Sequence, residues 1–382
     1  MFRQRVNSLR KKMLYSGIDT ALICDDDNIY YFSGYYDYLH MDFGRPTILV
    51  VQKDAETILV TPSMELRMAE TESVVDKIKP WNDGKGDEWR GVLSSFIGDN
   101  RRIGIEKEQI SPVVYRYLCE QISVKQLKDI TDIVADMRMI KSNYELQLAR
   151  DAGQVAEAMM TAGRDSLVPG VREYEVALAT AEAGTRKAAN LLEKYSKNSR
   201  MSPNIHFLQI MASGKNTTMP HHRASTRQIK CGEPVFLCFC GMTNFHRFKL
   251  GFDRTFWVKE ISDRSQEDIY KVAVESQAAA LNVLRKGVIA EEVHGAYAEV
   301  IQKAGFEYPF RCGRSTGFSF LEKPQLVYGD KTVLQSGMVF AVDGAVGADD
   351  FRAQVGDSFI ITDDGYEQIT SFSKDLNEVI VG

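Results

Sequence analysis

Four apolar runs in the second half of the chain decide the fold: VFLCFCG (235–241), DRTFWV (253–258), GMVFAVDG (337–344) and DSFIITDDG (357–365). Each run is short and rich in β-branched or aromatic residues, which is typical of a buried strand. Helical patterns lie at 173–195 and 265–285. Because the strands come from distant parts of the sequence, their side chains can converge on one concave face. The second half is therefore expected to be an α+β domain.

A helix is predicted to begin this domain. Ser142 and Glu145 have the spacing of a capping box, and small or apolar residues then recur on one helical face. Those residues are Leu146, Ala149, Gly153, Ala156 and Met160. We expect the second domain to cover residues 137–382.

The first part of the chain alternates strand-like and helical patterns, which favours an α/β domain over residues 1–136. Its first residues predict a helix with Val6, Leu9, Met13 and Leu14 at helical spacing. The strand-like runs are TALICD (20–25), TILVVQ (47–52), ETILVT (56–61) and IGIEK (103–107).

The composition is that of a soluble globular protein, with 382 residues, 44% hydrophobic residues and 26% charged residues. A net charge of -5 opposes binding to nucleic acid or to an anionic membrane surface. No apolar run approaches the roughly 20 residues of a membrane span. The six cysteines are scattered without a CxxC pair, which indicates reduced thiols. We expect a cytoplasmic protein.

Several blocks in the second half resemble the pita-bread superfamily (peptidase family M24), which includes methionine aminopeptidases, prolidases and creatinase. The first half is similar to the N-terminal domain of creatinase and prolidase. The resemblance implies an α/β N-terminal domain followed by an α+β pita-bread catalytic domain. The blocks are ASGKNTTMPHH (212–222), KCGEPVFLCFCG (230–241), FDRTFWV (252–258), CGRSTGFSF (312–320), LQSGMVFAVDG (334–344) and GDSFIITDDGYEQIT (356–370).

The peptidases of this superfamily hold two metal ions, but the corresponding residues here suit metal ions poorly. By the resemblance, the five ligand positions fall on Cys238, Gly251, Arg314, Asp343 and Gly356. A dinuclear site needs several carboxylates and usually an imidazole, so we expect the metal site to be lost and no cofactor to be needed. Cys238 and Cys240 share one side of a strand, yet we expect them to be packed thiols rather than zinc ligands.

Creatinase-like enzymes work without a metal, and the residues that carry their chemistry have counterparts here. The resemblance assigns catalysis to His221, Asp253 and Asp343, and binding of a substrate carboxylate to Phe43 and Arg45. These roles agree with elementary chemistry, because a histidine titrating at about pH 6.5 can exchange protons with water and a leaving nitrogen.

The remaining charged groups suit a small zwitterion. Asp253 and Asp343 can orient a cationic group, while Arg45 and Arg314 can hold a carboxylate. Ordinary structural roles stay open for each residue. His221 could be a solvated loop residue, Asp253 could pair with Arg254 on a surface, and Asp343 could form a turn.

The sequence therefore favours a metal-independent hydrolase of a C–N bond in a small carboxylate-bearing substrate, similar to creatinase or to ectoine hydrolases. Aspartates in place of creatinase's glutamates, and the added Arg314, argue against creatine itself. The resemblance also implies a homodimer. The alternatives are an Xaa-Pro dipeptidase or aminopeptidase and a non-catalytic binding relative.

Overall fold

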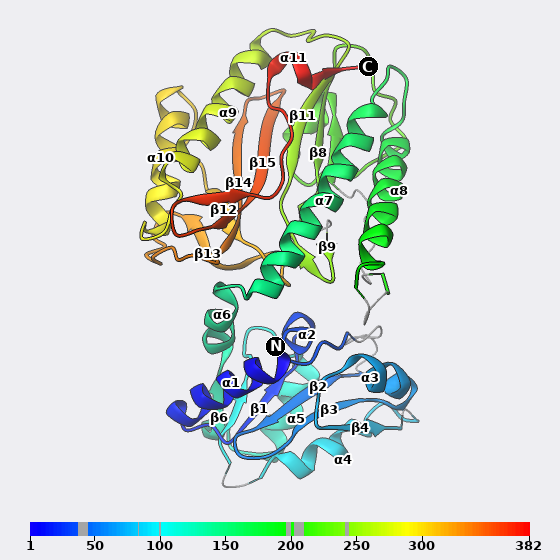
Figure 1. Cartoon of the computed structure of the whole chain (residues 1–382), viewed down its shortest axis with the longest axis vertical. Coiled ribbons are helices and arrows are strands. Elements are labelled where there is room, and N and C mark those ends of the chain that lie inside the picture. The colour runs from blue at the N-terminus through cyan, green and yellow to red at the C-terminus, as the bar shows by residue number, and fades with distance from the viewer. Residues whose placement is uncertain (37–44, 83, 99–100, 196–199, 202–209, 241–243) are drawn as a thin grey trace. The chain divides into compact units, whose positions relative to one another are not determined.

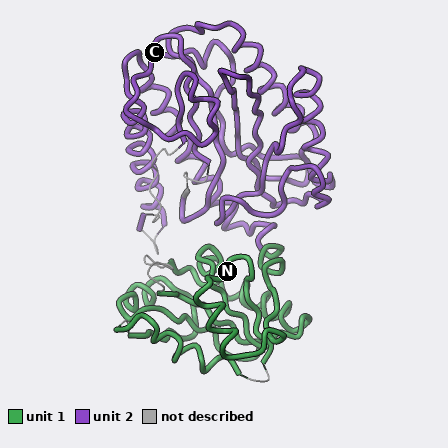
Figure 2. Tube along the Cα trace, turned by 180° about the vertical axis from the view of Figure 1, so that it is seen from behind, with its two compact units in different colours: residues 1–137 green, residues 138–382 purple. Residues whose placement is uncertain are grey.

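The protein is described here from a computed structural model that covers residues 1–36, 45–82, 84–98, 101–195, 200–201, 210–240 and 244–382. It divides into two compact units, Met1–Met137 and Arg138–Gly382 (Figures 1 and 2). Each unit has its own sheet, and α6 (Thr131–Met139) contains the boundary between them.

The N-terminal unit is built on a mixed sheet. Strand β1 runs parallel to β5 and antiparallel to β2, and β3 and β4 form a further parallel pair. The strand order is β4 (Lys77–Trp81), β3 (Thr57–Pro62), β2 (Ile48–Gln52), β1 (Thr20–Ile23), β5 (Ile103–Ile105) and β6 (Leu127–Asp129). The helices are α1 (Phe2–Ser16), α2 (Asp26–Ser33), α3 (Leu66–Glu72), α4 (Trp89–Leu93) and α5 (Pro112–Gln121), with short 3₁₀ turns at Ser63–Glu65, Ser94–Phe96 and Val124–Gln126.

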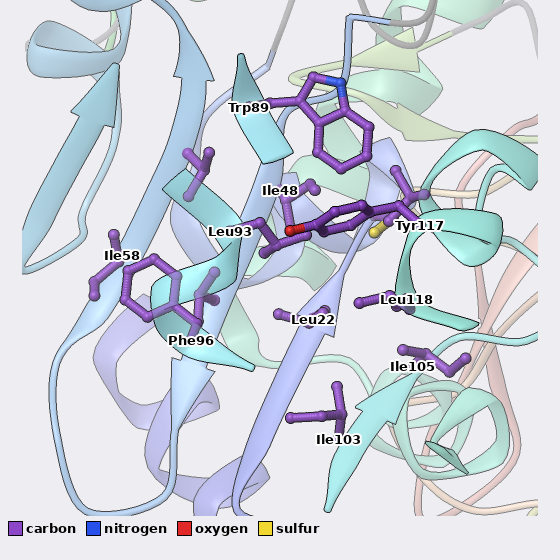
Figure 3. Packing of buried hydrophobic residues seen from close by; sticks show 14 of the residues in the cluster. Leu22, Ile48, Ile58, Trp89, Leu93, Phe96, Ile103, Ile105, Tyr117 and Leu118 are labelled. Carbon is purple, nitrogen blue, oxygen red and sulfur yellow. The ribbon is translucent and has the colours of Figure 1, made fainter. Parts of the chain in front are cut away.

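One face of this sheet packs against aromatic and aliphatic side chains from α4 and α5 (Figure 3). Trp89 and Tyr117 meet edge to face with their ring centroids 5.2 Å apart. Leu22 and Ile103, from the neighbouring strands β1 and β5, are completely buried in the same cluster. The expected α/β unit is present, with the four predicted strand runs at β1, β2, β3 and β5.

Helix α1 buries the expected Val6, Leu9 and Met13, but Leu14 is 62% exposed. Leu14 follows Met13 directly, so it is turned about 100° away from that residue around the helix. Leu14, although at helical spacing with the other three, therefore lies outside the buried face.

The C-terminal unit begins as predicted, with a capping box at α7 (Asn143–Asp165). The Ser142 side chain accepts from the Glu145 backbone N–H, and the Glu145 carboxylate accepts from the Ser142 N–H. Gly153 is needed in this helix, because an added Cβ would lie 2.1 Å from the carbonyl oxygen of Ile369. The other helices are α8 (Glu173–Leu192), α9 (Ser265–Val283), α10 (Ala290–Lys303) and α11 (Leu376–Val379), with a 3₁₀ segment at Gly214–Thr218.

Two helix pairs, α9 with α10 and α7 with α8, pack against the large sheet of this unit (Figure 1). The four runs predicted as strands become β8, β11, β14 and β15, which are neighbours in the sheet. Its order is β13 (Glu322–Val327), β12 (Arg311–Ser315), β14 (Val339–Gly347), β15 (Arg352–Ile361), β11 (Asp253–Val258), β8 (Pro234–Cys238) and β7 (Ile210–Ser213). Strands β16 (Tyr366–Gln368) and β17 (Ile380–Val381) pair with β15 and β11, while β9 (Asn244–Phe245) and β10 (Phe248–Lys249) form a hairpin.

The helices of the described residues include none that is both long and apolar enough to cross a membrane.

Candidate active site

A row of directly opposed residues crosses the middle of the large sheet. Asp253 on β11 is paired with Cys238 on one side and with Gly356 on the other, and Gly356 is paired in turn with Asp343 on β14. Directly opposed residues project from the same face of a sheet, so the row brings Asp253 and Asp343 together although 90 positions separate them in the sequence. The convergence predicted for side chains of strands that are distant in the sequence is therefore present.

Gly356 allows the two carboxylates to approach each other. A Cβ added at this position would lie 2.4 Å from Asp253 Oδ2 and 2.5 Å from Asp343 Oδ1, closer than atoms can pack. Both carboxylates thus occupy the space that a side chain at position 356 would need.

Beside this row lies a cavity of about 420 Å³. Five of its lining residues are candidates from the sequence, namely His221, Cys238, Cys240, Arg314 and Asp343. The walls also contain aromatic side chains, including Phe236 and Phe320. A concave site with apolar walls and a few convergent polar groups is the usual form of a small-molecule pocket.

Asp253 is fully buried and is held by neutral partners. Gln354 donates through Nε2 to Asp253 Oδ2 over 2.7 Å, and the Cys240 thiol lies 3.1 Å from Asp253 Oδ1. The alternative of a surface pair between Asp253 and Arg254 is wrong, because the buried Arg254 side chain donates instead to Asp357, whose Oδ1 is 2.7 Å away. Adjacent residues on a strand point to opposite faces, so Arg254 stabilises the other face of the sheet.

Asp343 has a different environment from Asp253. Arg314 Nη1 lies 3.1 Å from Asp343 Oδ2, while Asp343 Oδ1 is buried without a hydrogen-bond partner among the residues that the structure describes. Burial raises the pKa of Asp343 to about 7; Asp253 also raises it, whereas Arg314 acts in the opposite direction. Asp343 can therefore change its protonation state near neutral pH, as a general acid or base must.

Three further charged or amide residues of the cavity are not among the candidates from the sequence: Arg311, Arg352 and Gln354. Regular alternation along β12 would place Arg311 and Arg314 on opposite faces, but the register of β12 against β13 shifts at two points, and both residues line the cavity. Arg352 and Gln354 precede Gly356 at intervals of two along β15, a spacing that could have identified them.

The two neighbouring histidines differ in their surroundings. His222 is tied to β7, because its Nδ1 lies 2.8 Å from the Met211 carbonyl oxygen and its own carbonyl accepts from the Met211 N–H. His221 is exposed and lines the cavity. His222 is therefore anchored to β7, whereas His221 lies beside the cavity.

Two other predicted site residues belong to the N-terminal unit. Phe43 lies outside the described residues. Arg45 is half-buried and lies shortly before β2. The roles of both in binding a substrate carboxylate stay predictions.

The donor atoms of the site fit a pair of hard divalent cations poorly. Cys238, Cys240 and Asp253 place their possible ligand atoms within 4.8 Å of one another, a set that suits one thiophilic ion rather than two hard ones. Burial lowers the pKa of Arg314, but Cys240, Asp343 and Asp253 outweigh this effect and raise it overall, so a fixed positive charge lies beside any such ion. Cys238 is buried as expected, whereas Cys240 is half-exposed, and both thiols line the cavity.

The chain belongs to metallopeptidase family M24. The model of that family matches residues 147–363, and the model of the creatinase/prolidase N-terminal domain matches residues 5–140. The predicted resemblance is thus confirmed at the level of the family, and the predicted pairing of an α/β N-terminal domain with a pita-bread C-terminal domain is confirmed as well.

The similar proteins carry more than one kind of name. Over 396 residues the chain is 26% identical to the agropine synthesis cyclase of Rhizobium rhizogenes, covering 99% of this chain and 97% of that protein. Over 377 residues it is 27% identical to an Xaa-Pro dipeptidase of Pyrococcus furiosus, covering 98% and 99%. The crystal structure of the prolidase from Pyrococcus horikoshii OT3 matches with a TM-score of 0.82 and 24% identity over 98% of this chain and 99% of that one, which supports the fold.

Proposed function

We propose that this member of the M24 hydrolases acts without a metal ion and hydrolyses a C–N bond in a small carboxylate-bearing substrate. The observation that carries the proposal is the arrangement of two carboxylates and one guanidinium. The Asp253 and Asp343 carboxylates lie together in the space beside Gly356, and the Arg314 guanidinium is paired with Asp343. Two of the positions that the resemblance assigns to metal ligands are glycines, so they supply no donor side chain. A third is Arg314, which repels cations.

The groups around the cavity can perform the proton transfers that such a hydrolysis needs. His221, which lines the cavity, takes a proton from water as the water oxygen bonds to the substrate carbon. Asp343, whose pKa is raised to about 7, donates its proton to the nitrogen as the C–N bond breaks. Asp253, fixed by Gln354 and Cys240 behind Asp343, helps to keep Asp343 protonated until the transfer. Proton return from His221 to Asp343 through water restores the site.

A second candidate is an Xaa-Pro dipeptidase, and it is favoured by the names of several relatives from Pyrococcus and Lactobacillus. One relative of comparable identity is named a cyclase, so similarity in this range is compatible with different reactions. The two candidates differ in one requirement. A dinuclear peptidase needs carboxylate donors around its ions, whereas the carboxylate that lines this cavity, Asp343, is already paired with Arg314.

The test is an activity screen in two conditions, EDTA and added Mn²⁺, Co²⁺ or Zn²⁺. The substrates are guanidino acids, cyclic amidines, N-acyl amino acids and Xaa-Pro dipeptides. We expect turnover of a non-peptide substrate that EDTA leaves unchanged and that Asp343→Asn abolishes, while the exposed control Asp349→Asn keeps it. Cleavage of Xaa-Pro dipeptides alone, lost with EDTA and restored by metal, would establish the dipeptidase instead.

A further inference from the structure

The cavity contains more guanidinium groups than carboxylates. Arg311, Arg314 and Arg352 line it, and Asp343 is the carboxylate in the same lining, with Asp253 directly behind it. Resting on the function proposed above, we propose that the substrate is a small dicarboxylate or a similarly acidic compound, with one acid group bound by Arg311 and Arg352. This substrate class differs from the zwitterion expected from the sequence, because it requires a net negative charge on the substrate.

The partners of the three guanidiniums support this assignment. Arg314 is paired with Asp343. Arg311 donates instead to the amide oxygen of Gln325 over 3.2 Å, and Arg352 donates to the amide oxygen of Gln354. In the described part of the chain, neither Arg311 nor Arg352 has a carboxylate within ion-pair distance. Each therefore brings to the cavity a positive charge that no ion pair within the described residues neutralises.

Two buried guanidinium nitrogens that lack a hydrogen-bond acceptor among the described residues also favour an acidic substrate. Arg352 Nη1 and Arg314 Nε are buried and have no hydrogen-bond partner within the described residues, although a buried donor is normally satisfied. The Arg314 residue is only 3% exposed. Desolvation, with the nearby Arg314 as a second cause, lowers the pKa of Arg311, and an anion bound there would relieve that repulsion. A carboxylate fits because guanidinium groups bind it through paired, charge-assisted hydrogen bonds.

The arrangement along β15 places the acid group away from the reacting bond. Gln354 contacts Asp253, and Arg352 lies two residues further along the same side of the strand. Two residues of a strand span about 6.6 Å, which a chain of several carbon atoms can cover. Phe236 and Phe320 provide apolar walls beside Arg352 and Arg314, with the guanidinium carbon 5.8 Å and 4.2 Å from the ring centroids, respectively. A short apolar spacer between two polar ends suits this cavity.

Titration calorimetry on the full chain at pH 7, low salt and with EDTA tests the proposal without any turnover. The probes are glutarate, its monocarboxylate counterpart butyrate, inorganic phosphate and the dication 1,5-diaminopentane. We expect glutarate to bind at least tenfold more tightly than butyrate and the dication to give no binding. Phosphate should compete weakly. If phosphate binds more tightly than glutarate, or the dication binds better than either, the assignment is wrong.

Matched variants locate the bound acid group. Arg311→Gln and Arg352→Gln should each weaken glutarate binding about tenfold to a hundredfold, the usual effect of removing a charge-assisted hydrogen bond. Arg285→Gln, an exposed residue beyond α9, should leave it unchanged. Thermal melts check folding, and Arg311→Lys and Arg352→Lys, which keep the charge, should lose less affinity than the Gln variants. Unchanged affinity in both Gln variants overturns the proposal.

The outcome separates this inference from the proposed function. Glutarate binding that depends on Arg311 and Arg352, in a protein whose activity requires metal, supports the acidic substrate and refutes the metal-independent mechanism. Metal-free turnover of a zwitterion, without any glutarate binding, refutes the acidic substrate alone.

Discussion

Replacing Asp343 with Asn should change how the stability of the protein depends on pH. The folded protein holds the Asp343 proton more tightly than the unfolded chain does, because burial, assisted by Asp253, raises the pKa from 3.8 to about 7. The stabilising contribution is complete below about pH 3.8 and is lost as the pH rises through about 7. Asn has the same shape, stays neutral, and can still accept the hydrogen bond from Arg314.

The size of the effect follows from the two pKa values. Between pH 5 and pH 8, the wild-type protein should lose roughly 3 kcal/mol of unfolding free energy that the Asp343→Asn variant keeps. For a unit of this size, such a loss corresponds to a shift of about 6–12 °C in melting temperature. The buried Glu106, in the N-terminal unit, also has a pKa raised to about 7, mainly by desolvation, but it is present in both proteins and cancels in the difference.

Scanning calorimetry at half-unit steps of pH, with buffers matched in ionic strength, measures the difference directly. The melting temperature of the wild-type protein relative to Asp343→Asn should fall as the pH rises from 5 to 8. The exposed Asp349→Asn variant should follow the wild-type curve throughout. Parallel curves for wild type and Asp343→Asn would show that Asp343 does not titrate with the raised pKa, and its role as a proton donor near neutral pH would then fail.

On the substrate found by the activity screen, His221→Ala should lower kcat about a hundredfold to ten-thousandfold without changing the melting temperature, and near-normal kcat would exclude His221 as the proton acceptor. Arg45→Ala should raise KM with little change in kcat, whereas a loss confined to kcat would contradict a binding role. Arg254→Met leaves the buried Asp357 carboxylate with Lys374 as its remaining ion pair. The substitution should lower the free energy of urea unfolding by roughly 3–5 kcal/mol, and an unchanged urea midpoint would contradict this prediction. Light scattering should give twice the chain mass of 43.1 kDa, and a single-chain mass would refute the homodimer.

Local patterns were sufficient to locate much of the fold. The capping box at Ser142 depends on two residues three positions apart, and it starts α7 where the sequence predicts. The four apolar runs of the second half became strands because each carries its own hydrophobic signal. The two aspartates proposed as catalytic could also be singled out, but only through the family blocks around them, since an Asp before an Arg or a Gly is common in turns and on surfaces.

The properties of the site depend on contacts between residues far apart in the sequence. Asp343 and Asp253 meet because both are paired with Gly356 across the sheet, and that meeting is one cause of the raised pKa of Asp343. Strand periodicity gives the side on which a residue lies only while the strand is regular. Regular alternation would put Arg311 and Arg314 on opposite faces, but the register shifts in β12 let both residues line the cavity.

The sequence by itself therefore located the four central strands of the large sheet and the start of α7, and its family blocks pointed to the family and to the two aspartates. Which strands are neighbours, which residues face each other across them, and how deeply each charge is buried were decided by the tertiary structure. The physical reason is the distance along the chain over which each interaction acts. Propensity and capping act over a few residues, whereas strand register, burial and electrostatic coupling are set by the packing of the whole unit.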